Sequence, residues 1–283
     1  MTRILVTGGT GFIGTPLVRE LEKLHEVVTL SRDAGDIADP KTLARVKPVE
    51  HVFHLAGRTF VPDSWTDATG FMSTNVVGTA NVLGYCRRVS APLTFISTYV
   101  YGKPDRLPIA EGATPKPNNP YALSKYLAEQ LCEFAASHDR VPVTVIRPFN
   151  IYGPGQAKHF LIPTIIGQVK GGGSIRVMDL APKRDFLHVD DLVRLLISTA
   201  ARSDKPFRLV NAGSGESHSV EEIVALVQEF AGTNLKVLDE QKTRYEELND
   251  VRADVALAQK EFGWTPRISL REGIEQLVRG SRT

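Results

Sequence analysis

The sequence is poor in the residue types that mark a metal centre or a disulfide framework. Its 283 residues include only two cysteines, Cys86 and Cys132, and neither belongs to a CxxC motif or a cysteine–histidine cluster. We therefore expect no metal site, and we interpret both cysteines as buried thiols. The chain also lacks an excess of charge of either sign. The 34 lysines and arginines nearly balance the 32 aspartates and glutamates, so nothing favours nucleic acid or an anionic membrane as a partner.

Long apolar runs are also missing. No stretch is long enough to span a bilayer, and the opening MTRILVTGG lacks the apolar run of a secretory signal peptide. Hydrophobic residues make up 42% of the chain and charged residues 23%, which is typical of a folded globular protein. We expect a cytoplasmic protein that does not bind a membrane.

Short apolar runs alternate with segments of helical periodicity through the first half of the chain. Strands are predicted at residues 3–7, 27–30, 51–55, 93–97 and 143–147, and helices at 16–23, 41–46, 74–88 and 121–137. The strands are apolar on both faces, which is typical of a parallel sheet covered by helices on both sides. The predicted fold class is α/β, with a Rossmann-type doubly wound parallel sheet.

After residue 150 the pattern loosens into a stretch rich in glycine and proline. One more strand is predicted at 207–211, and a helix at 219–230 begins with a capping box of Ser219 and Glu222. We expect a main domain over residues 1–150, to which the strand near 207–211 returns. A smaller C-terminal α/β lobe over 151–283 is expected to bind substrate.

A glycine-rich turn, TGGTGFIG, joins the first predicted strand to the first helix. Gly9, Gly11 and Gly14 satisfy the pattern GxGxxG, and the strand–turn–helix context makes the match specific. Such a turn lets a pyrophosphate approach bare backbone at a helix N-terminus, where free N–H groups favour phosphate. We expect a dinucleotide, NAD(P), to bind here. The contacts expected from the turn are Gly8, Gly11, Phe12, Ile13 and Gly14.

The residues that follow the second predicted strand bear on the choice between NAD and NADP. An acidic residue there holds the ribose 2′-hydroxyl of NAD, whereas a nearby arginine accommodates the 2′-phosphate of NADP. Ser31 takes the place of the acid and Arg32 follows it, which gives a slight preference for NADP(H). Asp33 is adjacent, so NAD binding with a solvated Arg32 stays open.

Three side chains form a candidate catalytic set. Tyr121 and Lys125 lie four residues apart on a predicted helix and share a face, although a simple surface pair has the same spacing. A phenol of pKa about 10 is a poor base, but a neighbouring ammonium would stabilise its phenolate for proton exchange with a hydroxyl or carbonyl. Ser97 ends a predicted strand at the carboxyl edge of the sheet, where its hydroxyl, or that of Thr98, could bond the reacting oxygen.

The glycine turn, Ser97 ahead of VYG, and the YxxxK pair occur together in an order that resembles a known family. The chain is similar, from residue 3 to about 275, to the extended short-chain dehydrogenase/reductases of the NAD-dependent epimerase/dehydratase group, which act on nucleotide sugars. The resemblance implies that Ser97, Tyr121 and Lys125 are catalytic. It also implies a homodimer formed by the helices at 74–88 and 121–138.

The same resemblance implies further binding residues. The additional cofactor contacts implied, besides Tyr121 and Lys125, are Arg32, Asp36, Ile37, Leu55, Ala56, Gly57, Asn75 and Pro148. The substrate contacts implied are Ser97, Thr98, Asn150, Arg184 and Arg244. Of these, Arg184 and Arg244 would grip the substrate diphosphate, since planar guanidinium groups suit phosphate oxygens.

Two departures from the family pattern narrow the activity. Only three residues separate Arg32 from Asp36, where many members carry another helix and strand. We therefore expect the adenine-binding side of the cofactor site to be smaller than in those members. Dehydratases of the group usually carry an acid pair just after the serine. Here those positions are Thr98 and Tyr99, which argues against a dehydratase.

Two enzymatic activities remain open. The short loop after the second strand and the segment Asp63-Ser64-Trp65 resemble reductases of 4-keto-6-deoxy sugar nucleotides. The alternative is a C4 epimerase that keeps NAD tightly bound, since it needs the same three residues. A non-catalytic dinucleotide-binding protein is the alternative from another class, and the presence of both Tyr121 and Lys125 speaks against it.

Overall fold

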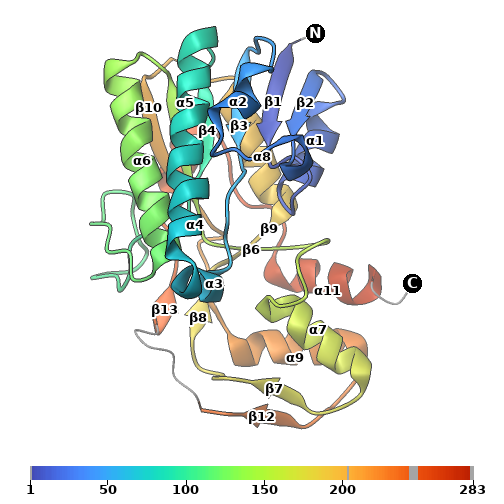
Figure 1. The fold of residues 1–283 in the computed structure, drawn as a ribbon. Helices are drawn as coiled ribbons and strands as arrows, with labels where there is room; N and C mark the ends of the chain where they lie inside the picture. The colour runs from blue at the N-terminus through green and yellow to red at the C-terminus, as the bar shows by residue number, and fades with distance from the viewer. Residues whose placement is uncertain (1, 203, 242–247, 281–283) are drawn as a thin grey trace.

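The centre of the molecule is a six-stranded parallel sheet (Figure 1). The structure is a computed structural model, and it describes residues 2–202, 204–241 and 248–280. The strands are β1 (Arg3–Thr7), β2 (Glu26–Leu30), β3 (His51–His54), β4 (Leu93–Ile96), β5 (Val143–Pro148) and β10 (Phe207–Ala212). Their order across the sheet is β10–β5–β4–β3–β1–β2, and every pairing is parallel. The predicted α/β fold class is confirmed.

The chain reverses its direction of winding at β1, which lies between β2 and β3. Open α/β sheets bind ligands at such a point, beyond the carboxyl ends of the strands. The sheet ends at β2, because the chain continues into a short turn of helix, η1 (Arg32–Ala34), and α2 (Pro40–Ala44) before it returns as β3. The short spacing between Arg32 and Asp36 predicted this reduced edge.

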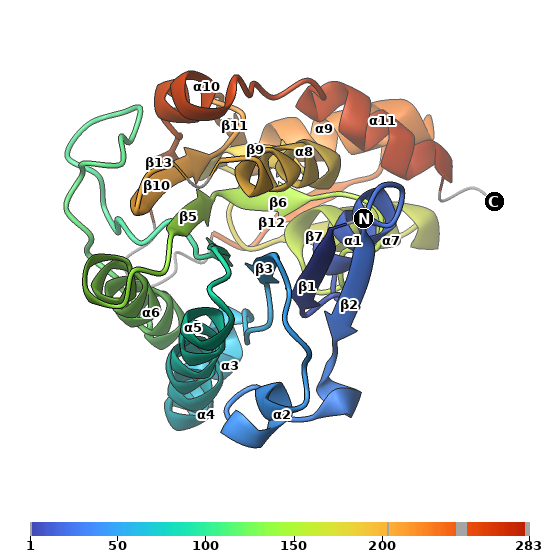
Figure 2. The same ribbon diagram turned by 90° about the horizontal axis from the view of Figure 1, so that it is seen from above.

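Helices cover both faces of the sheet, as the doubly apolar strands predicted (Figure 2). Side chains alternate along a strand, so Ile4 and Val6 pack on one face and Leu5 on the other. The helices against Ile4 and Val6 are α1 (Gly14–Leu21), α8 (Val189–Ala200) and α10 (Ala256–Phe262). Those against Leu5 are α2, α5 (Gly78–Val89) and α6 (Pro120–His138).

The helix predicted at 74–88 is part of a longer helical segment. It is preceded by α3 (Val61–Thr66) and α4 (Ala68–Met72), and the side chain of Asp67 accepts a hydrogen bond from Gly70 N at the start of α4. A π-helical turn, η2 (Ser73–Val77), joins α4 to α5. Such turns insert one extra residue into a helix and are often found at functional sites. This one contains Asn75, whose side chain is buried.

A smaller lobe lies beyond the carboxyl edge of the sheet (Figure 1). Its helices α7 (Leu161–Gly171), α9 (Val220–Ala231) and α11 (Leu270–Gly280) share a separate core with β7 (Ile175–Val177) and β12 (Val237–Asp239). Short strands connect the lobe to the sheet domain: β6 (Asn150–Tyr152), β8 (Lys183–Arg184), β9 (Phe186–His188), β11 (His218–Ser219) and β13 (Asp250–Val251). The predicted capping box is confirmed, because Ser219 Oγ accepts from Glu222 N and Glu222 Oε2 accepts from Ser219 N.

The two parts of the molecule are interleaved along the sequence. Helices α8 and α10 and strand β10 all follow residue 150, yet they pack on or within the six-stranded sheet. A division of the chain into domains at residue 150 therefore stays a prediction. None of the helices in the described part of the chain is both long and apolar enough to cross a lipid bilayer.

Candidate active site

The glycine turn between β1 and α1 leaves no room for side chains. Gly8 has a φ of +73°, and a Cβ there would lie 2.7 Å from Ala56 N. A Cβ on Gly14 would lie 2.1 Å from Gly8 O, so the start of α1 packs directly on the turn. No side chain among the described residues caps α1 at Ile13. Thr15 N donates to Gly11 O and Pro16 has no N–H, so the N–H groups ahead of Thr15 are the ones that face an incoming phosphate. The turn fits a dinucleotide pyrophosphate.

The adenosine side of this turn lies at the end of β2. Gly8 N donates to Leu30 O, which holds the end of β2 beside the turn. Arg32 is exposed, and its side chain makes no hydrogen bond or ion pair with the described residues. Asp36 is also exposed, whereas Ile37 is buried in the sheet core and packs against Gly78. Ile37 therefore supports the segment after β2 from the side of the sheet core.

A buried histidine connects the glycine turn to the segment after β3. Thr7 Oγ1 accepts from Ala56 N and contacts His54 Nδ1 at 2.7 Å, while His54 Nε2 contacts Thr79 Oγ1 at 3.0 Å. Thr79 donates to the carbonyl of Asn75, so Nε2 of the histidine must carry the proton. Burial lowers the pKa of His54 to about 3, which keeps the ring neutral. The network fixes the backbone of 55–57, the expected cofactor-lining turn.

Asn75 holds the turn at 55–57 against helix α6. Its Oδ1 accepts from Arg58 N at 2.9 Å, and its Nδ2 donates to Arg58 O and to Ser124 Oγ. A Cβ on Gly57 would lie 3.0 Å from Asn75 Oδ1, so the glycine permits this close approach. The side chain thus binds protein groups, and its direct contact with a cofactor stays a prediction.

Ser97 lies where β4 ends, at the carboxyl edge of the sheet. Its N–H continues the sheet by donating to Ile146 O at 2.8 Å, and the residue is 2% exposed. Its Oγ is buried and has no hydrogen-bond partner among the described residues. A buried hydroxyl without a partner is costly, so a ligand oxygen is its natural partner.

Tyr121 lies in the first turn of α6. Asn119 caps the helix by accepting from Ala122 N at 2.8 Å, and Pro120 occupies the first helical position. The phenol hydrogen-bonds Thr98, and the ring meets Phe71 edge-on at 6.3 Å. Burial raises the pKa of Tyr121 to about 12 despite that hydrogen bond. The sequence argument, which expected a stabilised phenolate, is wrong for the protein alone, because desolvation outweighs any help from Lys125.

Lys125 lies one turn further along α6 and is 5% exposed. Its Nζ lies 4.2 Å from the centroid of the Phe95 ring, on β4. Burial lowers the pKa of its ammonium to about 8, although Cys132 and, after it, Glu129 raise it. The predicted i, i+4 arrangement is present, and both side chains lie on the buried side of the helix rather than forming a surface pair.

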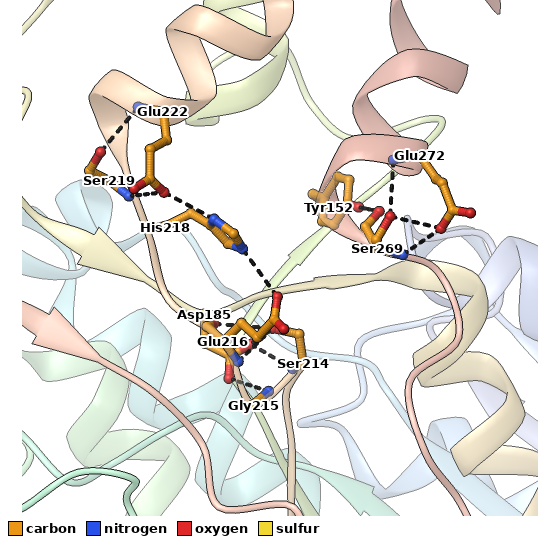
Figure 3. A network of polar contacts seen from close by, with 10 residues as sticks. All are labelled: Tyr152, Asp185, Ser214, Gly215, Glu216, His218, Ser219, Glu222, Ser269 and Glu272. Atoms are coloured by element: carbon orange, nitrogen blue, oxygen red, sulfur yellow. Dashed lines mark hydrogen bonds and ion pairs between the residues drawn. The ribbon is translucent and has the colours of Figure 1, made fainter.

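The segments around Asn150 are held together by Asp185. Its buried carboxylate accepts from Ser214 N, Ser214 Oγ, Gly215 N and Ala253 N, as Figure 3 shows for the serine and glycine. Its carbonyl accepts from the backbone and side-chain amides of Asn150, which begins β6 two residues after the buried Pro148 at the end of β5. Asp185 thereby joins three segments around Asn150.

Of the two arginines expected at the diphosphate, one lies within the described residues and the other does not. Arg184 Nη1 donates to the carbonyls of Lys183 and Leu248, so protein oxygens already hold part of its guanidinium. Arg244 lies outside the described residues. Phosphate binding by either arginine stays a prediction.

Sequence reasoning missed two buried polar groups next to these residues. One is the Thr7–His54–Thr79 network, and the other is an ion pair between Glu129 and Arg147. Each had a signal: His54 and Arg147 are polar residues at the ends of otherwise apolar strands, and Glu129 follows Lys125 by four residues on the same helix.

Comparison with known proteins agrees with this geometry. The model of the NAD dependent epimerase/dehydratase family matches residues 4–213. The GDP-6-deoxy-D-mannose reductase of Pseudomonas aeruginosa is 32% identical over 292 residues, which cover 98% of this chain and 96% of the relative.

Two solved structures cover almost the whole fold. The structure of RMD from Pseudomonas aeruginosa complexed with NADPH has a TM-score of 0.91 at 31% identity and covers 100% of both chains. MoeE5 in complex with UDP-glucose and NAD has a TM-score of 0.92 at 32% identity, with 99% of this chain and 98% of that one covered. The resemblance inferred from the glycine turn and the YxxxK pair is confirmed: this chain belongs to the NAD-dependent epimerase/dehydratase family, whose members are NAD(P)-dependent enzymes of nucleotide-sugar chemistry.

Proposed function

We propose that this protein reduces the 4-keto group of a 4-keto-6-deoxy sugar nucleotide with NADPH. The observation that carries the proposal is a protonated Tyr121 that hydrogen-bonds Thr98, the residue after Ser97, whose buried hydroxyl lacks a partner among the described residues. Reduction of a ketone requires a proton donor and a hydrogen-bond donor at one oxygen, and these two groups supply both.

The proton chemistry falls to three side chains of this chain. NADPH held over the glycine turn would supply the hydride to C4. Ser97 Oγ would donate a hydrogen bond to the keto oxygen and hold it beside Tyr121. The phenol would then donate its proton as negative charge develops on that oxygen. Lys125, one helical turn away, would offset the charge left on the phenolate and would bind the nicotinamide ribose side of the cofactor.

Two further observations support a reductase. Thr98 and Tyr99 follow Ser97, so no acid stands where a dehydratase needs one to protonate a leaving hydroxyl. The GDP-6-deoxy-D-mannose reductase relative covers nearly the whole chain, which makes a GDP-linked 4-keto-6-deoxy hexose the first substrate to test.

Cofactor stoichiometry tests the proposed reaction. With a GDP-linked 4-keto-6-deoxy hexose, we expect one NADPH to be oxidised for each sugar reduced. The loss of NADPH absorbance measures this oxidation. Release of NADP after each turnover should make the reaction depend on added NADPH. Interconversion of C4 epimers without net loss of added cofactor would instead establish the epimerase and overturn the reductase.

Arg32 should decide the preference for NADPH. Its exposed guanidinium, free of partners among the described residues, lies next to the glycine turn and suits a ribose 2′-phosphate. We expect Arg32→Ala to weaken NADPH binding about tenfold and to change NADH binding much less. Arg45→Ala, a nearby exposed arginine after α2, is the matched control. Equal affinities of the unaltered protein for both cofactors, measured by calorimetry, would contradict the preference.

We also propose that the protein is a homodimer assembled through α5 and α6, which lie side by side in both views (Figures 1 and 2). Leu123, Leu127 and Phe134 form an exposed apolar stripe along α6, and Phe134 is 58% exposed. An equivalent stripe on a second copy would bury this surface.

A charge placed in the stripe should break the dimer. We expect Phe134→Glu to weaken association at least tenfold, because a carboxylate would be desolvated in the interface. Leu24→Glu is the control, since Leu24 is 74% exposed but lies between α1 and β2. Light scattering at micromolar concentration measures both variants, and a monomeric unaltered protein would reject the proposal.

The compartment we propose is the cytoplasm. Both Cys86 and Cys132 are free and buried, which suits a reducing environment.

A further inference from the structure

A buried ion pair lies directly behind the catalytic face of α6. Arg147 on β5 binds the carboxylate of Glu129 on α6 through two hydrogen bonds. Its Nε donates to Glu129 Oε1 at 2.9 Å, and its Nη2 donates to Oε2 at 2.5 Å. The two side chains are 4% and 2% exposed. The proposed mechanism assigns neither residue a step.

The pair is held from a third side. The guanidinium carbon of Arg147 lies 4.8 Å from the centre of the Tyr101 ring, and the Tyr101 hydroxyl donates to Asn211 Oδ1 at 2.6 Å. Asn211 in turn donates to the carbonyl of Ile109. The arginine is thus fixed by β5, β10 and the loop between β4 and α6, and it presents a rigid fork to the helix.

Stability alone does not explain an ion pair at this place. Removing two charges from water costs more than their attraction returns unless the geometry is excellent, and apolar pairs of similar volume are often as stable. The position of the pair suggests another role, because Glu129 follows Lys125 by four residues on the same buried side of the helix.

The other groups that face Lys125 carry no net charge near neutral pH. His54 on β3 is neutral because burial lowers its pKa to about 3, and burial raises the pKa of the Cys132 thiol on α6 well above its usual value. The Phe95 ring on β4 and the Asn75 amide on η2 are neutral, and Tyr121 is protonated. Among the described neighbours of Lys125, Glu129 is the nearby carboxylate, and Arg147 is its ion-pair partner.

We propose that Glu129 and Arg147 are a positioning pair for Lys125, in which Arg147 fixes the Glu129 carboxylate one helical turn behind the ammonium so that the buried lysine keeps its proton and its orientation toward Tyr121. The inference rests on the proposed function only in that Lys125 serves catalysis. Its physical content, a carboxylate that raises the proton affinity of one lysine, concerns the protein without substrate.

Two variants of the pair test the inference. Glu129→Gln removes the anion but keeps an oxygen for Arg147, and Glu129→Gln/Arg147→Met removes both charges. The double variant guards against a folding failure of the single one, because a buried pair replaced as a whole is far less disruptive than one left with an unpaired charge. Glu261→Gln is the matched control, since Glu261 accepts from the buried Arg208 on the sheet edge away from Lys125.

The first readout is the proton affinity of Lys125 itself, measured by competitive acetylation with acetic anhydride across pH and quantified on the Lys125 peptide by mass spectrometry. We expect the midpoint to fall by about one pH unit in Glu129→Gln, by a smaller amount in the double variant, and to stay unchanged in Glu261→Gln. A folded double variant with an unchanged midpoint would overturn the inference and leave the pair a purely structural feature.

The second readout separates this inference from the proposed function. If Lys125 serves the reduction, the alkaline limit of kcat with NADPH and the keto sugar nucleotide should fall together with the acetylation midpoint. A moved midpoint without any effect on kcat would refute the catalytic role of Lys125 while upholding the positioning pair. An unmoved midpoint in an enzyme that still needs Lys125 would refute the positioning pair and uphold the catalytic role of Lys125.

Discussion

Tyr121→Phe should lower kcat about a thousandfold while leaving NADPH affinity within a few-fold of the unaltered protein. The loss follows from the role of the phenol as proton donor, since positioned acids and bases contribute 10²- to 10⁴-fold. The ring itself is retained, so its edge contact with Phe71 at 6.3 Å is preserved. The lost hydrogen bond with Thr98 should cost about 1 kcal/mol of folding stability or less.

A neighbouring tyrosine provides the control for this variant. Tyr126 lies five residues further along α6, is half-buried, and faces a different side of the helix. Tyr126→Phe should therefore keep its kcat. Single-turnover kinetics of NADPH oxidation measures both variants, and calorimetry measures cofactor affinity. A Tyr121→Phe protein that kept more than a tenth of its turnover would show that another group donates the proton.

Lys125→Met should abolish turnover and, unlike most core substitutions, make the protein without ligand more stable. The ammonium is 5% exposed, and burial lowers its pKa to about 8. Relative to the ordinary value of 10.5, this shift corresponds to about 3 kcal/mol that the fold spends on keeping the charge. Methionine has similar length, and the loss of the contact with the Phe95 ring reduces the gain. We expect a net gain of about 1–3 kcal/mol at neutral pH.

The pH dependence of this gain has a definite sign. Below pH 8 the lysine is charged in both states, so the unaltered protein carries the full penalty. Between the folded pKa of about 8 and the unfolded value of 10.5, the unfolded chain holds more protons, and stability of the unaltered protein rises with pH. The advantage of the methionine variant should shrink across that window.

Urea unfolding at neutral pH and near pH 9.5 measures this difference. Lys116→Met is the control, because the Lys116 side chain is 52% exposed and its ion pair with Asp105 lies at the surface. Its stability should change little at either pH. Equal destabilisation of the Lys125→Met protein at both values would mean that the ammonium contributes to folding and is not strained by burial.

Lys125 and Ser97 illustrate how the site stores free energy for its ligands. A buried ammonium and a buried hydroxyl that lacks a partner among the described residues both weaken the protein alone. If ligand oxygens bind both groups, as we propose, this cost would be recovered on binding, and affinity and catalysis would draw on strain present before binding.

The helices α8, α10 and α11 show where sequence reasoning fell short for the fold. They follow residue 150, where no helix was predicted at these positions, although each presents an apolar stripe to a core. The stripe on α8 packs on a sheet built mostly from residues more than 90 positions earlier, and nothing local indicates that partner.

Local pattern determined the glycine turn, the parallel sheet, the capped start of α6 and the spacing that places Tyr121 and Lys125 on one side of that helix. These features depend on interactions within a few residues, or on one alternation of apolar side chains, and they are therefore written in the sequence itself. The raised pKa of Tyr121, the unpartnered hydroxyl of Ser97 among the described residues, and the Glu129–Arg147 pair were decided only by tertiary structure. Each depends on desolvation and on partners brought together from distant strands, and burial is a property of the whole packed molecule.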